Sequence, residues 1–367
     1  MRVAIVHDWL TGMRGGEKVL EALLGLFPQA ELYTLVHKRG SVSPVIENRP
    51  VHRSLVNLLP MAASRYREYL PVFPFAIEQL GLDRFDLVVS SSHCAAKSVV
   101  VPGRTPHICY CHSPMRYAWD QFDAYFGPGR MGNAGSAVMR RVMARMARWD
   151  RATAGRADRY VANSQYVAGR IDRYYNRVAS VVYPPVDTDF FTPEAVRPRT
   201  HYLIVSALVP YKRVEVAVEA CRLLGRPLVV AGDGPERARL ETLGGGSVTF
   251  AGAGTIEQIR DLYRSAHAVF LPGEEDFGIV PVEAQACGTP VIALGRGGAL
   301  ETVVDGRTGV LVSESSAAAF ADGITRAETI AWDRAAIRAN AERFAATRFA
   351  SGFTTVVEEV MERRAHA

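Results

Sequence analysis

The sequence predicts an α/β protein of two Rossmann-like domains. Short apolar segments alternate with helical or loop segments along the whole chain, which is typical of parallel sheets with helices on both faces. At 367 residues the chain is long for one core and sufficient for two. A proline-rich segment, Tyr183 to Pro193, is unlike the sequence on either side of it and marks the join between the domains.

The first domain is predicted to extend over residues 1–183 and the second over residues 184–342. Each strand candidate is a short run of apolar residues. The candidates in the first domain are Val3 to Val6, Leu32 to Thr34, Leu87 to Ser90, His107 to Cys111, Arg159 to Ala162 and Ser180 to Tyr183. Those in the second are Tyr202 to Ser206, Leu228 to Ala231, Val248 to Phe250, Ala268 to Leu271, Val291 to Ala293 and Gly309 to Leu311.

The segment Leu55 to Leu80 breaks this pattern. It mixes leucine, phenylalanine and tyrosine with Pro60, Pro71 and Pro74, so it is too interrupted for one regular helix. Two interpretations stay open: an irregular helical insertion packed on the sheet, or a surface that faces an acceptor or a lipid.

Composition and cysteine usage indicate a cytoplasmic globular protein. The short apolar start before His7 and Asp8 fits a buried strand rather than a signal peptide, and no apolar run approaches the length of a membrane span. The odd number of cysteines, without a CxxC pair, fits neither a disulfide framework nor a zinc site. They are Cys94, Cys109, Cys111, Cys221 and Cys287.

Basic charge is concentrated between Met139 and Tyr160, where seven arginines face two aspartates. On a helical wheel an apolar stripe of methionine, valine and tryptophan opposes Arg141, Arg145 and Arg148. The arginine face fits an ordinary solvated helix surface, and it also suits peripheral contact with an anionic membrane. No nucleic-acid partner is expected, because no recognised nucleic-acid motif accompanies this charge.

Ligands of open parallel sheets bind at the carboxyl ends of strands, and four such loops carry chemically informative residues. The first loop follows His7 and contains Gly15 and Gly16 before a helix. These glycines permit close backbone approach to a ligand, although they do not form a dinucleotide fingerprint. The second loop, Tyr110 to Asp120, places His112 directly at a strand end, where it is expected to face the ligand.

Three further residues of the second loop are acceptor-binding candidates. Arg116, Tyr117 and Trp119 suit a sugar by stacking and hydrogen bonding, whereas simple packing is the competing interpretation.

The third loop, Ser206 to Glu215, brings Lys212 and Arg213 to a helix start. Cations oppose the helix dipole there, so they indicate an anion that needs neutralising. The alternative is local pairing with Glu215 or Glu219.

The fourth loop holds Glu275 and Glu283, separated by seven residues. A helix is expected to begin near Pro281, with Val280 at the cap and Glu283 in the first turn. The uncapped amides from Phe277 to Val282 suit a phosphate, and carboxylates on both sides suit sugar hydroxyls. This pattern favours a nucleotide sugar, while a capping role for Glu283 is the alternative.

One acidic motif is not assigned to metal binding. Asp187 and Asp189 form a DxD sequence, but they lie in the proline-marked join, where side-chain capping of a turn explains them. We expect neither a metal ion nor a cofactor; Lys212, Arg213 and the helix amides would stabilise a departing diphosphate instead.

The run Leu271 to Ala293 resembles the signature of retaining glycosyltransferases of family 4, and the other loops extend the resemblance over most of the chain. The resemblance implies a GT-B fold, with two Rossmann-like domains facing across a cleft. It also implies that the final helical stretch, Arg343 to Arg364, returns to the first domain, which would then include residues 343–367.

The resemblance assigns roles to the candidate residues. Glu283 would hold ribose hydroxyls, Glu275 the sugar, and His112 the transferred sugar. Lys212 would bind the diphosphate, and the Gly15 and Gly16 loop would face the donor phosphates and the acceptor. The amides that join Lys212 are those of Phe277, Gly278, Ile279 and Val280. Many members carry an arginine where this chain has Ser206 and Ala207, so Arg213 is a candidate replacement.

Motifs such as HisAspTrpLeu and ValProTyrLysArg are similar to a mannosyltransferase-like branch that acts on lipid-linked oligosaccharides in cell-surface polysaccharide synthesis. GDP-mannose is therefore the expected donor, and a UDP-sugar is the alternative. A nucleotide-sugar epimerase of the same fold and a basic scaffold or nucleic-acid binder are the competing functions.

Overall fold

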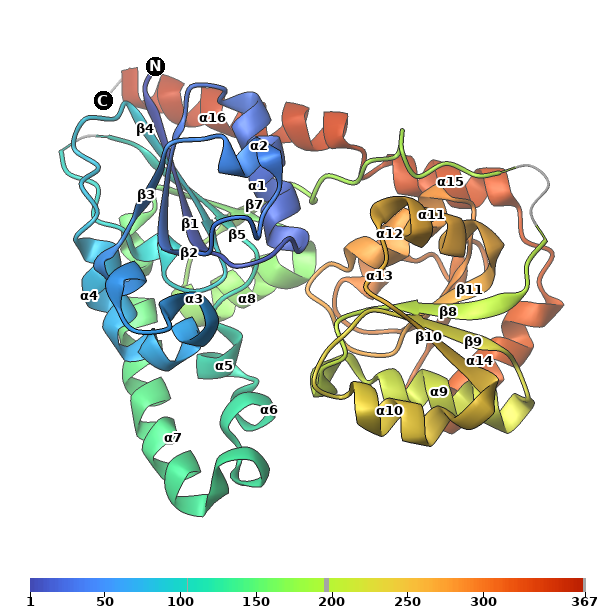
Figure 1. Cartoon of the computed structure of the whole chain (residues 1–367). Helices are drawn as coiled ribbons and strands as arrows, with labels where there is room; N and C mark the ends of the chain where they lie inside the picture. The colour runs from blue at the N-terminus through green and yellow to red at the C-terminus, as the bar shows by residue number, and fades with distance from the viewer. Residues whose placement is uncertain (104, 195–197, 366–367) are drawn as a thin grey trace. The chain divides into compact units, whose positions relative to one another are not determined.

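The structure, a computed structural model, describes residues 1–103, 105–194 and 198–365. The chain divides into two compact units. Unit 1 comprises Met1–Pro185 and the chain from Phe349 onward, and unit 2 comprises Val186–Arg348. The sequence placed these boundaries after residues 183 and 342. Each unit is a parallel sheet with helices on both faces (Figure 1).

The sheet of unit 1 has the order β3-β2-β1-β4-β5-β6-β7, and all neighbouring strands are parallel. Strand β1 runs to Leu10, so Asp8 and Trp9 belong to the strand and not to the loop after it. Strand β3 was not predicted from the sequence. The strands are β1 (Val3–Leu10), β2 (Glu31–His37), β3 (Val51–Arg53), β4 (Leu87–Ser92), β5 (His107–Cys111), β6 (Arg159–Ala162) and β7 (Ala179–Val181).

Successive residues of a strand point to opposite faces of the sheet, so its apolar side chains form a core on each face, and helices cover both. Ile5 packs with Leu20 of one helix and Phe353 of another, whereas Val6 lies in a separate core with Phe73 and Met146. The helices of unit 1 are α1 (Gly15–Leu26), α2 (Pro44–Glu47), α3 (Ala62–Arg65), α4 (Phe73–Glu78), α5 (Arg116–Trp119), α6 (Phe122–Phe126), α7 (Pro128–Ala152), α8 (Gln165–Tyr175) and α16 (Ala346–Ala365).

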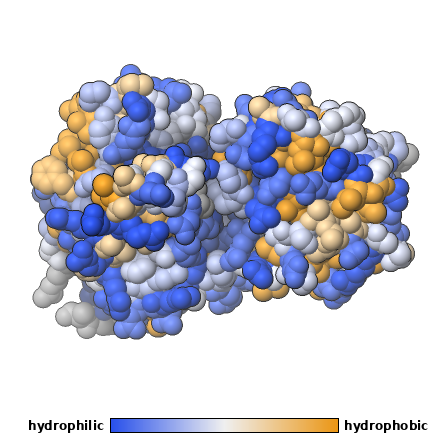
Figure 2. Space-filling model, turned by 90° about the horizontal axis from the view of Figure 1, so that it is seen from below, coloured by the Kyte–Doolittle hydropathy of each residue, from blue (hydrophilic) through white to orange (hydrophobic). Residues whose placement is uncertain are grey.

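The segment Leu55 to Leu80 is an irregular helical insertion packed on the sheet. It consists of α3, α4 and two 3-10 helices, Leu55–Leu58 and Tyr66–Val72. Buried residues such as Val56 and Phe73 join the core, whereas Leu58, Met61 and Phe75 are exposed. Figure 2 shows surface hydrophobic residues in separate patches among hydrophilic ones. The insertion is therefore packed, and an additional role of its exposed residues stays a prediction.

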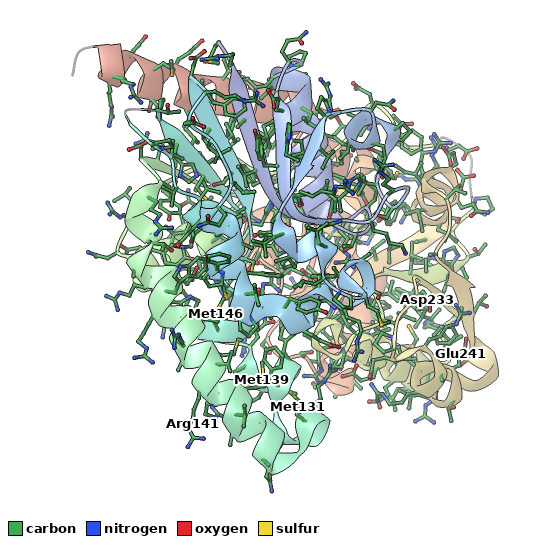
Figure 3. All side chains as sticks on the ribbon, turned by 60° about the vertical axis from the view of Figure 1, so that its left-hand side comes forward. Met131, Met139, Arg141, Met146, Asp233 and Glu241 are labelled. Atoms are coloured by element: carbon green, nitrogen blue, oxygen red, sulfur yellow. The ribbon has the colours of Figure 1, made fainter. Side chains whose placement is uncertain are left out.

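Helix α7 has the predicted two faces and a kink at Gly132, whose φ is 67°. Met143 and Met146 are buried, while Arg141 is exposed and points away from the helix (Figure 3). The helix therefore packs through its methionine stripe.

The sheet of unit 2 has the order β10-β9-β8-β11-β12-β13, again with parallel neighbours. Its strands are β8 (His201–Val205), β9 (Leu228–Ala231), β10 (Val248–Gly252), β11 (Ala266–Leu271), β12 (Val291–Leu294) and β13 (Gly309–Val312). Its helices are α9 (Val214–Leu224), α10 (Arg237–Gly244), α11 (Ile256–Ser265), α12 (Ile279–Ala286), α13 (Ala299–Thr302), α14 (Ala317–Thr329) and α15 (Arg334–Glu342).

The predicted final helical stretch, Arg343 to Arg364, corresponds to the single helix α16. Helix α15 belongs to unit 2, and α16 continues into unit 1. From α16, Phe349, Phe353, Val356 and Val357 join the core that also contains Ile5. The chain thus returns to unit 1 after unit 2 is complete.

Candidate functional site

The topology of unit 2 creates a switch point between β8 and β11. These strands are neighbours, but the chain leaves β8 toward β9 and leaves β11 toward β12. The loops after them therefore diverge, and ligands of open parallel sheets bind at such a point. The third and fourth candidate loops are these two loops.

Helix α12 begins at Ile279, two residues before the predicted start. Gly278 is the N-cap, with φ 87°, and no side chain caps the helix. Glycine adopts this left-handed conformation readily, and Pro281 is tolerated because its missing N–H falls among the helix-start amides that lack internal partners. The predicted uncapped helix start is therefore present, although its first residue differs.

Glu283 is consequently the fifth residue of α12 and not part of the first turn. It is buried, and Tyr263 donates a hydrogen bond from its hydroxyl to Glu283 Oε2 at 2.9 Å. Burial, followed by the charge of Glu283, raises the pKa of Tyr263 well above its ordinary value, so the hydroxyl remains a donor. Glu283 therefore does not cap the helix. Sequence reasoning missed Tyr263, because no sequence pattern around this α11 tyrosine indicates that it contacts Glu283.

Lys212 and Glu275 are brought together by the two loops. The Lys212 ammonium contacts Glu275 Oε1 as an ion pair, and both side chains are largely shielded from solvent. The neighbouring Arg213 has φ 54°, a conformation that non-glycine residues rarely adopt. Its Nε donates to Glu215 at 2.7 Å and its Nη2 to the Ser315 carbonyl at 3.2 Å. Arg213 thus makes the local pair that the sequence offered as the alternative.

Glycines allow these loops to touch through their backbones. A Cβ added at Gly273 would lie 2.6 Å from the carbonyl oxygen of Tyr211, and one added at Gly298 would lie 2.3 Å from Phe277 Cα. The Gly298 N–H also donates to the Glu275 carbonyl at 2.8 Å. No larger residue fits at either glycine without moving the loop it touches, so the glycines fix the backbone around Glu275.

In unit 1 the switch point lies between β1 and β4. Asp8, buried in β1, holds the chain after β4 because its two carboxylate oxygens accept four backbone N–H groups. These belong to His93, Cys94, Ala95 and Ala96, at 2.6–2.9 Å. Sequence reasoning placed Asp8 near the site but did not find this role.

His112 lies at the end of β5, as predicted, beside the start of α1. Its Nε2 is 2.8 Å from Ser91 Oγ, and a Cβ added at Gly16 would be 3.7 Å from the same nitrogen. Gly15 and Gly16 are the first two residues of α1. Burial, and then the imidazoles of His93 and His7, lower the pKa of His112 well below its ordinary value. The ring is therefore neutral at pH 7, and the structure brings Gly16 and His112 together.

Two of the acceptor-binding candidates are tied into unit 1. The Tyr117 hydroxyl donates to Cys94 Sγ at 2.7 Å. Trp119 Nε1 donates to Asp150 Oδ2 at 2.7 Å, and its ring stacks on Tyr174. Arg116 is the first residue of α5 and also has interactions within the protein. An acceptor role for these residues stays a prediction.

The first aspartate of the DxD sequence caps a turn as expected, since Asp187 Oδ1 accepts the Phe190 N–H at 2.9 Å. Within the described ranges, no group of three or more His, Cys, Asp or Glu side chains is arranged to hold a metal ion.

Two family models match this chain. The model "Glycosyl transferases group 1" matches residues 187–344, and "Glycosyltransferase Family 4" matches residues 13–190. Proteins named D-inositol 3-phosphate glycosyltransferase are similar over part of the chain. The one from Mycolicibacterium smegmatis is 34% identical over 215 residues, 52% of this chain and 49% of that protein. The one from Streptomyces bingchenggensis is 30% identical over 234 residues, 50% of this chain and 51% of that protein. The chain spans about half the length of these relatives.

Solved structures share the fold over nearly the whole chain. Sucrose-phosphate synthase from Thermosynechococcus elongatus has a TM-score of 0.74 and 20% identity, covering 99% of this chain and 100% of that one. HepE from Anabaena in complex with UDP-glucose has a TM-score of 0.71 and 19% identity, covering 97% and 99%. Since the two family models together match residues 13–344, the chain belongs to the family 4 glycosyltransferases and has their GT-B fold.

Proposed function

We propose that this protein is a retaining, metal-independent glycosyltransferase. It would transfer a hexose from a nucleotide sugar to a glycan or lipid-linked oligosaccharide during cell-surface polysaccharide synthesis. The observation that carries the proposal is the contact between Lys212 and Glu275 next to the loop that leads into the uncapped start of α12. A cation, the backbone amides of a helix start and carboxylates are the groups that a sugar diphosphate requires.

Unit 2 would bind the donor. Lys212 and the amides of residues 277–280 would hold the diphosphate and stabilise its charge as it leaves. Glu283, oriented by Tyr263, would bind the ribose, and Glu275 would bind the sugar and stabilise the positive anomeric centre. A contribution of Arg213 stays part of the proposal, although its side chain bonds Glu215. Unit 1 would supply His112, Gly15 and Gly16, and would bind the acceptor.

Two donors follow from different observations. The sequence motifs near Lys212 and His112 favour GDP-mannose. HepE, whose fold this chain shares, was solved with UDP-glucose, and this favours a UDP-sugar. The names of the relatives add a phosphorylated inositol to the acceptors worth testing.

Thermal shifts with GDP, UDP and ADP in EDTA test the donor site. We expect selective stabilisation by GDP, whereas selective stabilisation by UDP would assign a UDP-sugar. Stabilisation by none of them would contradict the proposal. Product analysis with and without acceptor then separates transfer from epimerisation, and the anomeric configuration of the product tests retention.

The proposal includes peripheral contact with the inner, anionic face of the cell membrane through α7. The exposed side of this helix carries Met131 and Val138. The one acidic residue of α7, Asp150, is buried and paired with Lys97 at 3.1 Å. The exposed charges of α7 are therefore all basic: Arg130, Arg140, Arg141, Arg145, Arg148 and Arg151. Within the part of the chain that is described, no helix combines the length and apolarity needed to cross a bilayer.

A further inference from the structure

A chain of four polar side chains leads from α1 to His112. His7 Nε2 lies 3.8 Å from Glu17 Oε1, and His7 Nδ1 lies 3.1 Å from Ser91 Oγ. Ser91 Oγ lies 2.8 Å from His112 Nε2. His7 and Ser91 are fully buried and Glu17 is nearly so. The chain joins α1, β1, β4 and the end of β5, which meet only in the folded unit.

Glu17 sets the direction of this chain by its charge: at 3.8 Å its carboxylate is too far from His7 Nε2 for a hydrogen bond, but an anion there favours an N–H over a lone pair on the nitrogen that faces it. Burial raises the pKa of Glu17, but its interaction with His7 lowers it overall. Its other oxygen, Oε2, accepts the Arg14 N–H at 3.0 Å. The carboxylate is therefore ionised at neutral pH, and the nitrogen that faces it, His7 Nε2, is the one expected to carry a proton.

When both imidazole rings are neutral, the proton on His7 Nε2 determines where the protons of Ser91 and His112 lie. With its proton on Nε2, His7 has a lone pair on Nδ1 and accepts from the Ser91 hydroxyl. Ser91 has a single proton, so its oxygen must accept from His112 Nε2–H. His112 is then left with a lone pair on Nδ1. The opposite tautomer would bring two lone pairs together at 2.8 Å.

We propose that Glu17, His7 and Ser91 are positioning residues that hold His112 as its Nε2–H tautomer, so that Nδ1 accepts a hydrogen bond from a hydroxyl of the transferred sugar. The tautomer assignment rests on the contacts within unit 1 alone, whereas the role of Nδ1 rests on the proposed function.

Ser90 provides a matched control on the same strand. Its hydroxyl is also buried and lies 2.8 Å from a histidine nitrogen, but that nitrogen is Nε2 of His107. Ser90→Ala and Ser91→Ala therefore each remove one buried serine–histidine contact of equal length, and only Ser91→Ala alters the chain to His112.

The test is long-range 1H–15N NMR of the full chain with labelled histidine at pH 8, where imidazoles are neutral. The His112 signal is assigned with His112→Gln. We expect the Nε2–H pattern in the wild type and in Ser90→Ala, and a shift toward the other tautomer in Ser91→Ala. Glu17→Gln introduces an amide that can also donate to His7, so it should give a mixture.

Kinetics test the functional half. We expect Ser91→Ala to lower kcat about tenfold, with the donor KM within about twofold, as loss of one oriented hydrogen bond predicts. Ser90→Ala should retain kcat. An Nδ1–H pattern in the wild type, or equal effects of both serine variants, would overturn the inference. Absence of transfer with every donor would refute the proposed function, and the NMR result would still decide the tautomer.

Discussion

Lys212 and Glu275 neutralise each other across two loops of unit 2. Lys212 ends the 3-10 turn after β8, and Glu275 lies in the loop after β11. By the proposed function, the lysine binds the diphosphate and the glutamate binds the sugar. A bound donor would therefore replace this ion pair with two new contacts, one from its diphosphate to Lys212 and one from its sugar to Glu275. Binding of the diphosphate by Lys212 would thus release the Glu275 carboxylate.

Substitution of either partner should separate binding from transfer. We expect Lys212→Ala to weaken nucleoside diphosphate binding about 10–100-fold, because a charge-assisted hydrogen bond contributes about 1.5–3 kcal/mol. Glu275→Gln should bind the diphosphate as tightly as the wild type, or more tightly, because it leaves Lys212 without a competing anion. Its transfer rate should fall about 100-fold or more.

Titration calorimetry and initial rates measure the two effects. Lys38→Ala, an exposed lysine of unit 1, is the control for loss of one positive charge. Unchanged diphosphate affinity in Lys212→Ala would remove this residue from the donor site.

Gly298 should be intolerant of any side chain. A Cβ there would lie 2.3 Å from Phe277 Cα, so Gly298→Ala must displace the loop that carries Glu275. We expect it to destabilise unit 2 by about 1–3 kcal/mol and to abolish the thermal shift with nucleoside diphosphate. Gly246→Ala is the control, since a Cβ there meets no atom within 4 Å. Equal thermal shifts in the two variants would show that loop geometry does not control binding.

His107 should make unit 1 less stable in mild acid. Burial lowers its pKa from 6.5 to about 4, while Nδ1 faces the Arg156 carbonyl at 3.1 Å. Between these values the unfolded chain binds a proton that the folded chain does not, so stability falls as pH falls from 6.5 toward 4. At pH 5 the loss should be about 2 kcal/mol relative to pH 7.5.

Urea unfolding at pH 7.5 and pH 5 measures this loss in the wild type and in His107→Gln, which cannot titrate there. We expect the variant to lose about 2 kcal/mol less than the wild type between the two pH values. Parallel losses would show that His107 does not control the acid sensitivity.

Helix α7 should bind anionic vesicles through its arginines. Reversal of Arg141, Arg145 and Arg148 to glutamate should weaken binding to phosphatidylglycerol vesicles at least 100-fold, because each basic residue contributes about 1 kcal/mol. The matched control reverses three exposed arginines elsewhere, Arg39, Arg173 and Arg222, with the same change of net charge. Vesicle sedimentation measures the binding. Equal loss of binding in both variants, or wild-type binding to neutral vesicles as strong as to anionic ones, would exclude a specific role of α7 in membrane contact.

The fold was largely predictable because its signals are local. Apolar strands such as Leu87 to Ser90 and His107 to Cys111 were placed correctly, since burial on both faces leaves a continuous apolar run. The edge strand β3 was missed because Val51 and His52 are only partly buried, Arg53 is exposed, and the strand carries no such run. The start of α12 was misplaced because Gly278 begins the helix, and the sequence emphasised Pro281 instead.

The candidate site was predictable in residue type but not in its contacts. The charge and position of Lys212 and Glu275 in their loops identified them as candidates. Their ion pair was not predictable, because it joins residues 63 positions apart in the chain. Tyr263 and Ser91 were missed for a related reason. Each is an ordinary buried residue in the sequence. Its role depends on the carboxylate or imidazole that folding places within hydrogen-bond distance of it.

The return of α16 to unit 1 has a consequence for synthesis on the ribosome. Unit 2 is one continuous stretch of chain, whereas the core around Ile5 also needs Phe349 and Phe353. Unit 1, although translated first, therefore needs residues that are synthesised only after unit 2, so unit 1 is the last to complete its core.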